Sequence, residues 1–241
     1  MKIGIFDSGS GGLTILKKLI ENNKYHDYIY VGDTKNFPYG EKTTEELKTY
    51  ADKIINFFIE QRCKTIIIAC GTLSISIYPY LKEKYKNLNI IDVITPMLEY
   101  IKENNYQNIG IVGTNTMINN LKNINLNNLN IIPNSSKTLA TLIEEDNQSK
   151  IKSTIKTLIN PYLNKDLDLF ILGCTHYPLA INYFKEYLNT KILDLSTLIP
   201  KYIDNGSILK ITIYFTSIHN KDIKNVLKTI NSKYTVSKLN I

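Results

Sequence analysis

The chain lacks the features that would place it in a membrane or outside the cell. None of its apolar stretches approaches the roughly 20 residues that a bilayer-spanning helix needs. Its N-terminus has neither the apolar core nor the small-residue cleavage site of a secretory signal peptide. Three cysteines in 241 residues are too few and too unevenly placed for a disulfide framework. We therefore expect a cytoplasmic protein with no membrane partner.

Two further absences narrow the range of ligands. Lys and Arg are scattered, with no basic run and no basic residues interleaved with aromatics, so the formal charge of +7 is a weak indication of nucleic-acid binding. The sequence also shows no obvious metal-ligand cluster and no pyridoxal-binding signature. We expect a small-molecule substrate, with no nucleic-acid partner, no metal and no organic cofactor.

Strand-like and helix-like segments alternate along the whole chain. Short apolar runs predict strands at residues 2–6, 28–32, 65–68, 89–93, 108–112, 131–133, 169–172, 191–195 and 210–215. Helical segments are predicted between them, among others one that begins near residue 13 and others at residues 43–62, 72–85, 97–104, 138–145, 149–163, 179–188, 196–203 and 221–230. This alternation predicts a parallel α/β fold.

The chain also reads as two similar halves. We expect two α/β domains, residues 1–95 plus 206–241 and residues 96–205, that face each other across a cleft. The bend at Thr95-Pro96 is the predicted first crossing between them, and the tail from residue 206 is expected to return to the first half.

Two cysteines follow two matched strands. An apolar run at residues 169–172 ends two residues before Cys174, with His176 close behind, and a β-branched run at residues 65–68 ends two residues before Cys70. Ligands of open α/β sheets bind just outside the carboxyl ends of the strands. These thiols are therefore predicted to face a ligand.

The alternative interpretation of a free cysteine is a small buried core residue, and for a lone cysteine that is the more common outcome. Cys63 has no polar residues beside it in the sequence and is interpreted as structural. Cys70 and Cys174 differ because both occupy the same position in matched segments. The pairing favours a mechanism that uses both thiols.

A glycine-rich turn, Asp7 to Gly12, follows the first predicted strand and opens a helix near Leu13. Such a turn presents backbone N–H groups to a phosphate or a carboxylate. Asp7 could bond a neighbouring acid or base, or it could cap the helix. A dinucleotide-binding turn needs a third glycine where Thr14 stands, although Asp33 lies where a ribose-binding acid is expected. Dinucleotide binding therefore stays a weaker alternative.

Together these motifs resemble the cofactor-independent glutamate racemases of the aspartate/glutamate racemase superfamily. The resemblance is carried in chain order by Asp7-Ser8-Gly9-x-Gly11-Gly12, Pro38-Tyr39-Gly40, Ala69-Cys70-x-Thr72, Gly113-Thr114 and Leu172-Gly173-Cys174-Thr175-His176-Tyr177-Pro178, where x is any residue. It implies interconversion of L- and D-glutamate, with D-glutamate supplied for bacterial peptidoglycan. It also implies a site in a cleft between two similar α/β domains and, as a family-level expectation, a homodimer.

The resemblance implies a role for each matching residue. Cys70 and Cys174 would be the acid and the base on opposite faces of the substrate α-carbon, with Asp7 assisting Cys70 and His176 assisting Cys174. Glu144 would be a further acidic residue near the second thiol, on a looser match. The substrate's carboxylates and amino group would lie against Ser8, Tyr39, Gly40, Gly71, Thr72, Thr114 and Thr175.

The chemistry agrees with these roles on independent grounds. Inverting a stereocentre by proton transfer needs an acid and a base on opposite faces of the carbon, which two side chains supply directly. A free thiol has a pKa of about 8.5, so a cysteine base must be activated by its surroundings. Backbone N–H groups and threonine hydroxyls can hold the extra charge that develops on the α-carboxylate.

The chain departs from the family pattern at two places. The family usually carries Asn after the first cysteine, where this chain has Gly71, and Asp194-Leu195-Ser196 stands in place of a segment like Asp-Ser-Ala. At Gly71 a water molecule or a backbone amide could take the place of the Asn side chain against the substrate. Alternatively, the substitution could shift specificity towards another acidic amino acid.

Two alternatives to a glutamate racemase therefore stay open. The first is an aspartate or broader acidic amino-acid racemase, although aspartate-type relatives tend to carry an acidic residue where this chain has His176. The second, of a different class, is a non-catalytic or dinucleotide-binding α/β protein.

Overall fold

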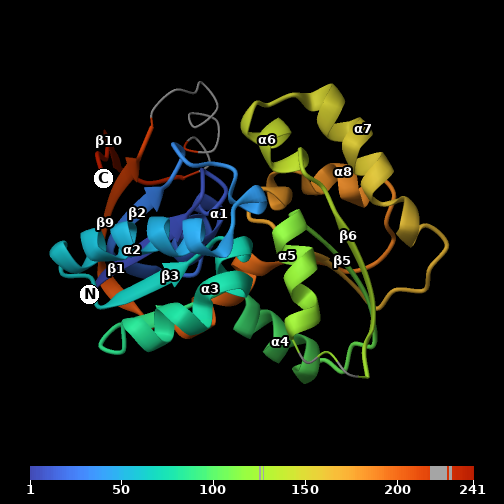
Figure 1. The fold of residues 1–241 in the computed structure, drawn as a ribbon, viewed down its shortest axis with the longest axis horizontal. Coiled ribbons are helices and arrows are strands. Elements are labelled where there is room, and N and C mark those ends of the chain that lie inside the picture. Colours follow the sequence, from blue (N-terminus) through green and yellow to red (C-terminus); the bar gives the residue numbers. More distant parts are fainter. Residues whose placement is uncertain (125, 127, 218–226, 228–229) are drawn as a thin grey trace.

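The strands of the molecule form two sheets. The structure is a computed structural model that describes residues 1–124, 126, 128–217, 227 and 230–241. Within these residues, a six-stranded sheet has the order β10-β9-β2-β1-β3-β4 and a four-stranded sheet has the order β6-β5-β7-β8. All of the strand pairs in both sheets are parallel. The predicted parallel α/β fold class is confirmed (Figure 1).

Each sheet is built from its own parts of the chain. The strands of the larger sheet are β1 (Lys2–Asp7), β2 (Lys24–Gly32), β3 (Thr65–Ile68), β4 (Asn89–Ile91), β9 (Gly206–Phe215) and β10 (Thr235–Lys238). Those of the smaller sheet are β5 (Asn108–Gly113), β6 (Asn130–Ser135), β7 (Leu169–Leu172) and β8 (Ile192–Asp194). The domain boundaries expected at 95/96 and 205/206 stay a prediction.

Helices connect the strands. The α-helices of the described residues are α1 (Leu13–Glu21), α2 (Thr44–Glu60), α3 (Gly71–Lys84), α4 (Ile94–Glu103), α5 (Asn115–Asn120), α6 (Leu139–Glu144), α7 (Gln148–Leu158) and α8 (Ile181–Lys185). The 3₁₀ helices are η1 (Tyr39–Glu41), η2 (Leu121–Asn123), η3 (Asn160–Tyr162), η4 (Tyr177–Ala180) and η5 (Leu195–Tyr202).

Local sequence accounts for much of this arrangement. The central strands β3 and β7 are short apolar runs in which every residue is buried, as strands covered on both faces require. The helix α2 begins with a capping box, in which the Thr43 side chain accepts from the Glu46 N–H and the Glu46 carboxylate accepts from the Thr43 N–H.

The bend predicted at Thr95-Pro96 was wrong. Both residues lie in the first turn of α4, where proline is tolerated because its missing N–H has no partner within the helix. The Asp92 carboxylate accepts from the N–H groups of Ile94 at 2.6 Å and Thr95 at 2.8 Å, and these bonds start the helix. The first crossing therefore runs into a helix and not through a turn.

Other differences are smaller. The helix predicted at residues 196–203 is the 3₁₀ helix η5, which contains Pro200, a residue unable to donate a backbone bond. The predicted 179–188 helix is divided into η4 and α8. Strand β10 was not predicted, and most of the helix predicted at 221–230 lies outside the described residues.

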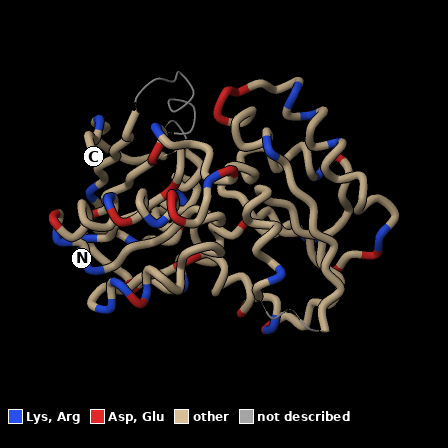
Figure 2. The backbone as a smooth tube through the Cα atoms, viewed as in Figure 1, with Lys and Arg blue, Asp and Glu red and all other residues tan. Residues whose placement is uncertain are grey.

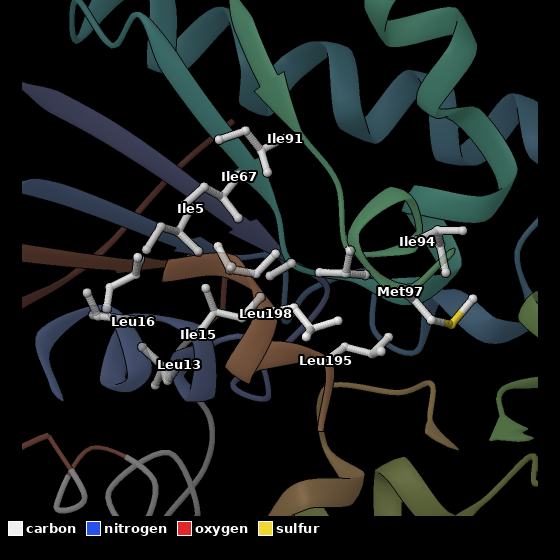
Figure 3. Packing of buried hydrophobic residues seen from close by; sticks show 14 of the residues in the cluster. Ile5, Leu13, Ile15, Leu16, Ile67, Ile91, Ile94, Met97, Leu195 and Leu198 are labelled. Atoms are coloured by element: carbon white, nitrogen blue, oxygen red, sulfur yellow. The ribbon is translucent and has the colours of Figure 1, made fainter. Parts of the chain in front are cut away.

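One apolar cluster is shared by the two sheets. Ile5 and Ile67 of the larger sheet pack in one layer with Ile15 of α1, Ile94 of α4 and Leu198 of η5 (Figure 3). Residues of β5 and β7 belong to the same cluster: Ile109, Ile111, Leu169 and Ile171. A second cluster lies between the larger sheet and α2 and α3, and a third between the smaller sheet and α6, α7 and α8. The shared layer holds one sheet against the other.

Charged residues of both signs are interspersed over the two halves (Figure 2). Within the described ranges, none of the helices combines the length and the apolar character needed to cross a bilayer.

Candidate active site

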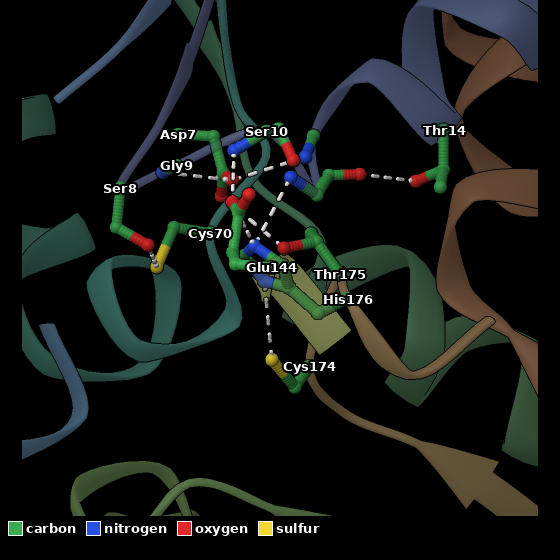
Figure 4. Close-up of polar contacts among 12 residues, drawn as sticks. Asp7, Ser8, Gly9, Ser10, Thr14, Cys70, Glu144, Cys174, Thr175 and His176 are labelled. Atoms are coloured by element: carbon green, nitrogen blue, oxygen red, sulfur yellow. Dashed lines mark hydrogen bonds and ion pairs between the residues drawn. The ribbon is translucent and has the colours of Figure 1, made fainter. Parts of the chain in front are cut away.

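Side chains from both sheets meet where the strands end. Asp7 is the last residue of β1, Cys70 follows β3 and Cys174 follows β7. Figure 4 shows Asp7 and the two cysteines in one polar cluster with Glu144 and His176. The topology of the sheets thus brings together residues that are far apart in the sequence.

Cys70 lies at the start of a long helix. It is the N-cap residue of the 14-residue helix α3 and is 5% exposed. Its thiol donates to the Ser8 hydroxyl oxygen across an Sγ–Oγ distance of 3.9 Å. Burial raises the pKa of Cys70 to about 12, and the nearby Asp7 charge acts in the same direction. In this arrangement Cys70 is a thiol at neutral pH, and it can serve as a proton donor.

Asp7 holds the glycine-rich turn and touches the other half of the molecule. Its Oδ2 accepts from the N–H groups of Gly9 at 3.3 Å and Gly12 at 3.0 Å, and its Oδ1 accepts from the Thr175 hydroxyl at 3.3 Å. Burial raises the pKa of Asp7, although the positive charge of His176 and the two backbone N–H groups act against it. Asp7 influences Cys70 through its charge, since the hydrogen bond of the Cys70 thiol goes to Ser8.

Cys174 belongs to a buried chain of polar groups. Its Sγ lies 3.8 Å from His176 Nδ1, and His176 Nε2 lies 2.7 Å from Glu144 Oε1. Burial lowers the pKa of His176, but its contacts with Cys174 and Glu144 outweigh burial and leave it well above the ordinary value. The pKa of Glu144 is lowered because the contacts with His176 and Ser10 outweigh its burial. His176 and Glu144 therefore form a charged pair.

The protonated state of His176 determines which hydrogen bonds its two ring nitrogens make. A protonated imidazole carries hydrogen on both nitrogens, so Nδ1–H points to Cys174 Sγ and Nε2–H donates to Glu144. The Gly11 N–H points at His176 Nε2 across 3.2 Å. A Cβ at Gly11 would lie 2.6 Å from His176 Nδ1, so only glycine allows this approach. The imidazole therefore packs directly on the glycine-rich turn.

Glu144 also links the two sheets. Its Oε1 accepts from the Ser10 N–H at 2.7 Å, across 134 positions of the sequence. Glu144 ends α6, in the half of the chain that carries Cys174, while Ser10 lies in the glycine-rich turn after β1. Glu144, which matched the family pattern only loosely, is thus in direct contact with His176.

A second group of contacts lies around the start of α5. The hydroxyls of Thr72 and Thr114 are 2.8 Å apart, and the Thr116 hydroxyl donates to the Gly40 carbonyl oxygen at 2.6 Å. Gly71 lies directly against Gly173, and a Cβ at residue 71 would overlap the Gly173 carbonyl oxygen. The departure at Gly71 therefore permits a close backbone approach between the segments that carry the two thiols.

Tyr39 is buried, and its hydroxyl is bonded within the protein. It donates to Asp33 Oδ2 at 2.5 Å, and Asp33 also accepts from Thr216 at 2.7 Å and from Asn36. Asp33 is 2% exposed, and both of its carboxylate oxygens accept bonds from its own chain. This arrangement opposes the ribose-binding role considered for Asp33.

Sequence reasoning missed three participants. Ser10 supplies the N–H that Glu144 accepts, Thr116 bonds the Gly40 carbonyl, and the Met117 thioether packs beside Gly113 and Gly173. Ser10 lies in the predicted glycine-rich turn and Thr116 in α5, but their partners lie in distant segments. Within the part of the chain that the structure describes, no three His, Cys, Asp or Glu side chains are grouped as a metal site requires.

Comparisons with known proteins identify relatives of one kind. The chain is 37% identical over 209 residues to a glutamate racemase of Fusobacterium nucleatum, covering 80% of this chain and 76% of that protein. It is 33% identical over 255 residues to a glutamate racemase of Hydrogenobaculum, covering 100% and 97%. No model of a protein family matches the chain.

Solved structures agree with these relatives. The structure of a glutamate racemase from Francisella tularensis in complex with D-glutamate has a TM-score of 0.89 at 28% identity, covering 99% of this chain and 97% of that one. The glutamate racemase from Aquifex pyrophilus has a TM-score of 0.80 at 27% identity, covering 99% and 98%. An aspartate racemase from Picrophilus torridus shares the fold, with a TM-score of 0.58 at 18% identity over 83% and 93%.

Proposed function

The chain belongs to the glutamate racemase family, and we propose that it interconverts L- and D-glutamate by moving the α-proton between substrate and two thiols, Cys70 and Cys174. The observation that carries this proposal is the convergence of two buried cysteines after β3 and β7, each beside its own polar partners. The relatives found by sequence are glutamate racemases, which favours glutamate over aspartate and an enzyme over a binding protein.

The proton transfer uses one cysteine on each face of the α-carbon. One sulfur, as a thiolate, takes the α-proton and leaves a carbanion with added negative charge on the α-carboxylate. The other cysteine, as a thiol, gives its proton to the opposite face and becomes a thiolate. Substrate charge and atoms are conserved, and the configuration is inverted. No electron-sink cofactor takes part in this scheme.

The surrounding groups suit an acidic amino acid. The hydroxyls of Thr72 and Thr114 are donors that can hold the carboxylates, and donors placed beforehand stabilise charge as it develops. We assign substrate contacts to the predicted set Ser8, Tyr39, Gly40, Gly71, Thr72, Thr114 and Thr175. The contacts of Ser10 with Glu144 and of Thr72 with Thr114 join the two halves, so we propose that the halves separate to admit substrate.

The biological setting follows from the family. Glutamate racemases supply D-glutamate for peptidoglycan, and we assign this chain the same role in the cytoplasm. Unpaired Cys63, Cys70 and Cys174 fit a reducing compartment. We further propose domains at residues 1–95 plus 206–241 and 96–205, and a homodimer, which light scattering of the purified protein would detect as twice the chain mass of 27.6 kDa.

The decisive experiment is circular dichroism of separate L-glutamate, D-glutamate, L-aspartate and D-aspartate samples, with purified protein and no added cofactor. We expect both glutamate signals to decay to zero and both aspartate signals to persist. A double Cys70→Ala, Cys174→Ala variant is the control for contaminating racemase activity. Decay of aspartate alone would contradict the substrate assignment, and persistence of all four signals would contradict the activity.

A further inference from the structure

A small internal cavity lies behind Cys174. The volume open to the centre of a water molecule is about 10 Å³, and the walls come from Leu172 to Thr175 after β7, Thr14 and Ile15 of α1, Val93, and Asp194 to Ser196 at the start of η5. This volume matches the space that one buried water needs. Four of its lining residues have polar side chains: Thr14, Thr175, Asp194 and Ser196.

Ser196 supplies the observation that points to a ligand there. Its side chain is 2% exposed, and its hydroxyl oxygen has no hydrogen-bond partner among the described residues. Its N–H donates to Asp194 Oδ1 at 2.9 Å. Burial raises the pKa of Asp194, and the contacts with Ser196 act against that shift. Buried hydroxyls in folded proteins almost always have a partner, frequently an ordered water.

A second, larger cavity lies beside the first and shares two of its lining residues. It has a volume of about 440 Å³ and is lined by Lys17 and Lys18 of α1, by Lys191 beside β8, and by Leu179 and other residues. Thr14 and Asp194 line both cavities. These two polar residues are therefore common to the walls of the inner and the outer cavity.

The reaction creates a need for such a path. One turnover leaves the two cysteines with their protonation states exchanged, since one sulfur has lost a proton and the other has gained the substrate's. Before a second turnover in the same direction, the cysteine that acted as the acid must regain a proton. The cysteine that acted as the base must lose one. The Cys174 thiol is 8% exposed, and Glu144 and His176 lie on its side of the cleft.

We propose that the inner cavity holds one water molecule, which carries protons between Cys174 and the solvent of the outer cavity; this inference rests on the proposed racemase function. When Cys174 is a thiolate, the water gives one hydrogen to Sγ and takes one from a water in the outer cavity, so it is regenerated. When Cys174 is a thiol, the same transfers run in reverse. Ser196 is a positioning residue that holds this water by its hydroxyl.

Steady-state kinetics of Ser196→Val test the proposal, because the added methyl groups occupy the room for the water. Resetting the cysteines follows product release, so it limits kcat but is absent from kcat/KM. We expect kcat and KM to fall by the same factor, about tenfold, in both directions, with kcat/KM within about twofold of the parent. The solvent deuterium isotope effect on kcat should rise as well.

Two further variants keep the test decisive if the valine protein folds poorly. Ser196→Ala removes the hydroxyl but leaves the room, and we expect a smaller fall of about threefold in kcat with the same unchanged kcat/KM. Ser74→Ala is the matched control, because that buried hydroxyl donates to the Ile68 carbonyl oxygen and accepts from the Val93 N–H. It should lower the melting temperature but leave kcat and KM each as in the parent.

The outcomes separate this inference from the assigned function. Absence of racemisation by the parent protein would contradict the function itself. An active parent with kcat and KM unchanged in both Ser196 variants would overturn only the water path. A fall in kcat/KM with unchanged isotope effects would also overturn it, because it would show damage to the chemical step.

Discussion

The two segments that carry the thiols look alike in the sequence but differ in the structure. Cys70 caps the 14-residue helix α3 and donates to a neutral hydroxyl, with the carboxyl group of Asp7 nearby. Cys174 precedes the four-residue 3₁₀ helix η4 and lies beside the charged pair of His176 and Glu144. A negative group therefore acts on one sulfur and a positive group on the other.

This difference teaches that a repeated strand-and-cysteine pattern does not make two equivalent acid/base groups. Burial is common to both sites, with 5% exposure at Cys70 and 8% at Cys174, so burial does not distinguish them. The neighbouring charges do, and they come from segments outside the repeated pattern. The two directions of racemisation should therefore respond unequally to substitutions near one thiol.

Replacing either thiol should have the largest effect. Cys70→Ser and Cys174→Ser should each lower kcat by about 10³-fold or more, because a serine hydroxyl is a far weaker acid than a thiol. The fold should persist, since serine is nearly the same size, and thermal unfolding provides the control. Circular dichroism of the substrate measures racemisation, and full activity in either variant would contradict the two-thiol mechanism.

Replacing His176 should separate the two directions. In His176→Asn, the direction in which Cys174 must act as the base should slow by about 10- to 100-fold, and the reverse direction less. The reason is that, of the two thiols, Cys174 is the one in contact with the imidazole, at 3.8 Å from Nδ1. Initial rates from L-glutamate and D-glutamate measure this asymmetry under single-turnover conditions. Equal slowing in both directions would indicate a purely structural histidine.

Removing the charge of Glu144 should affect stability in a pH-dependent way. The His176 pKa is raised above 6.5, so its contribution is complete below that pH and is lost as the pH rises through the raised value. The Glu144 pKa is lowered below 4.5, so its contribution is complete above that pH and is lost as the pH falls through the lowered value.

Glu144→Gln should therefore lower the free energy of unfolding by about 3 kcal/mol between these limits, because it leaves a buried cation without its partner. The gap between variant and parent should narrow at alkaline pH, where His176 is neutral in both. Urea unfolding across the pH range measures both trends. A gap that stays constant into the alkaline range would contradict the charged pair.

Substitutions of Gly71 and Gly173 should change stability by a smaller amount. They compare the two segments that carry the thiols. Gly71→Ala would press a methyl group on the Gly173 backbone carbonyl, which cannot move alone, and should destabilise the closed arrangement by about 1–3 kcal/mol. Gly173→Ala meets mainly the flexible Met117 side chain and should cost less. Thermal unfolding and KM for glutamate measure both variants, and a larger cost at Gly173 would reverse the expected order.

Local pattern was sufficient for the strands and for the position of each thiol. Short β-branched and apolar runs bounded by small residues predicted β3 and β7, and the parallel fold class followed from their alternation with helices. His176 could be found because it lies two positions from Cys174. Local pattern failed at the start of α4, because a rule that treats Pro96 as a helix breaker does not detect the bonds from Asp92 that start the helix. It also missed β10.

The sequence by itself determined the parallel α/β class, the two cysteines at strand ends and a family resemblance, because these depend on residues close together in the chain. Only the tertiary structure decided that Glu144 meets both Ser10, 134 positions away, and His176, 32 positions away. It also decided that Ser196 lies behind Cys174. The reason is physical: periodicity reports which face of an element is buried, whereas the packing of two sheets on one shared apolar layer sets which strand ends come together.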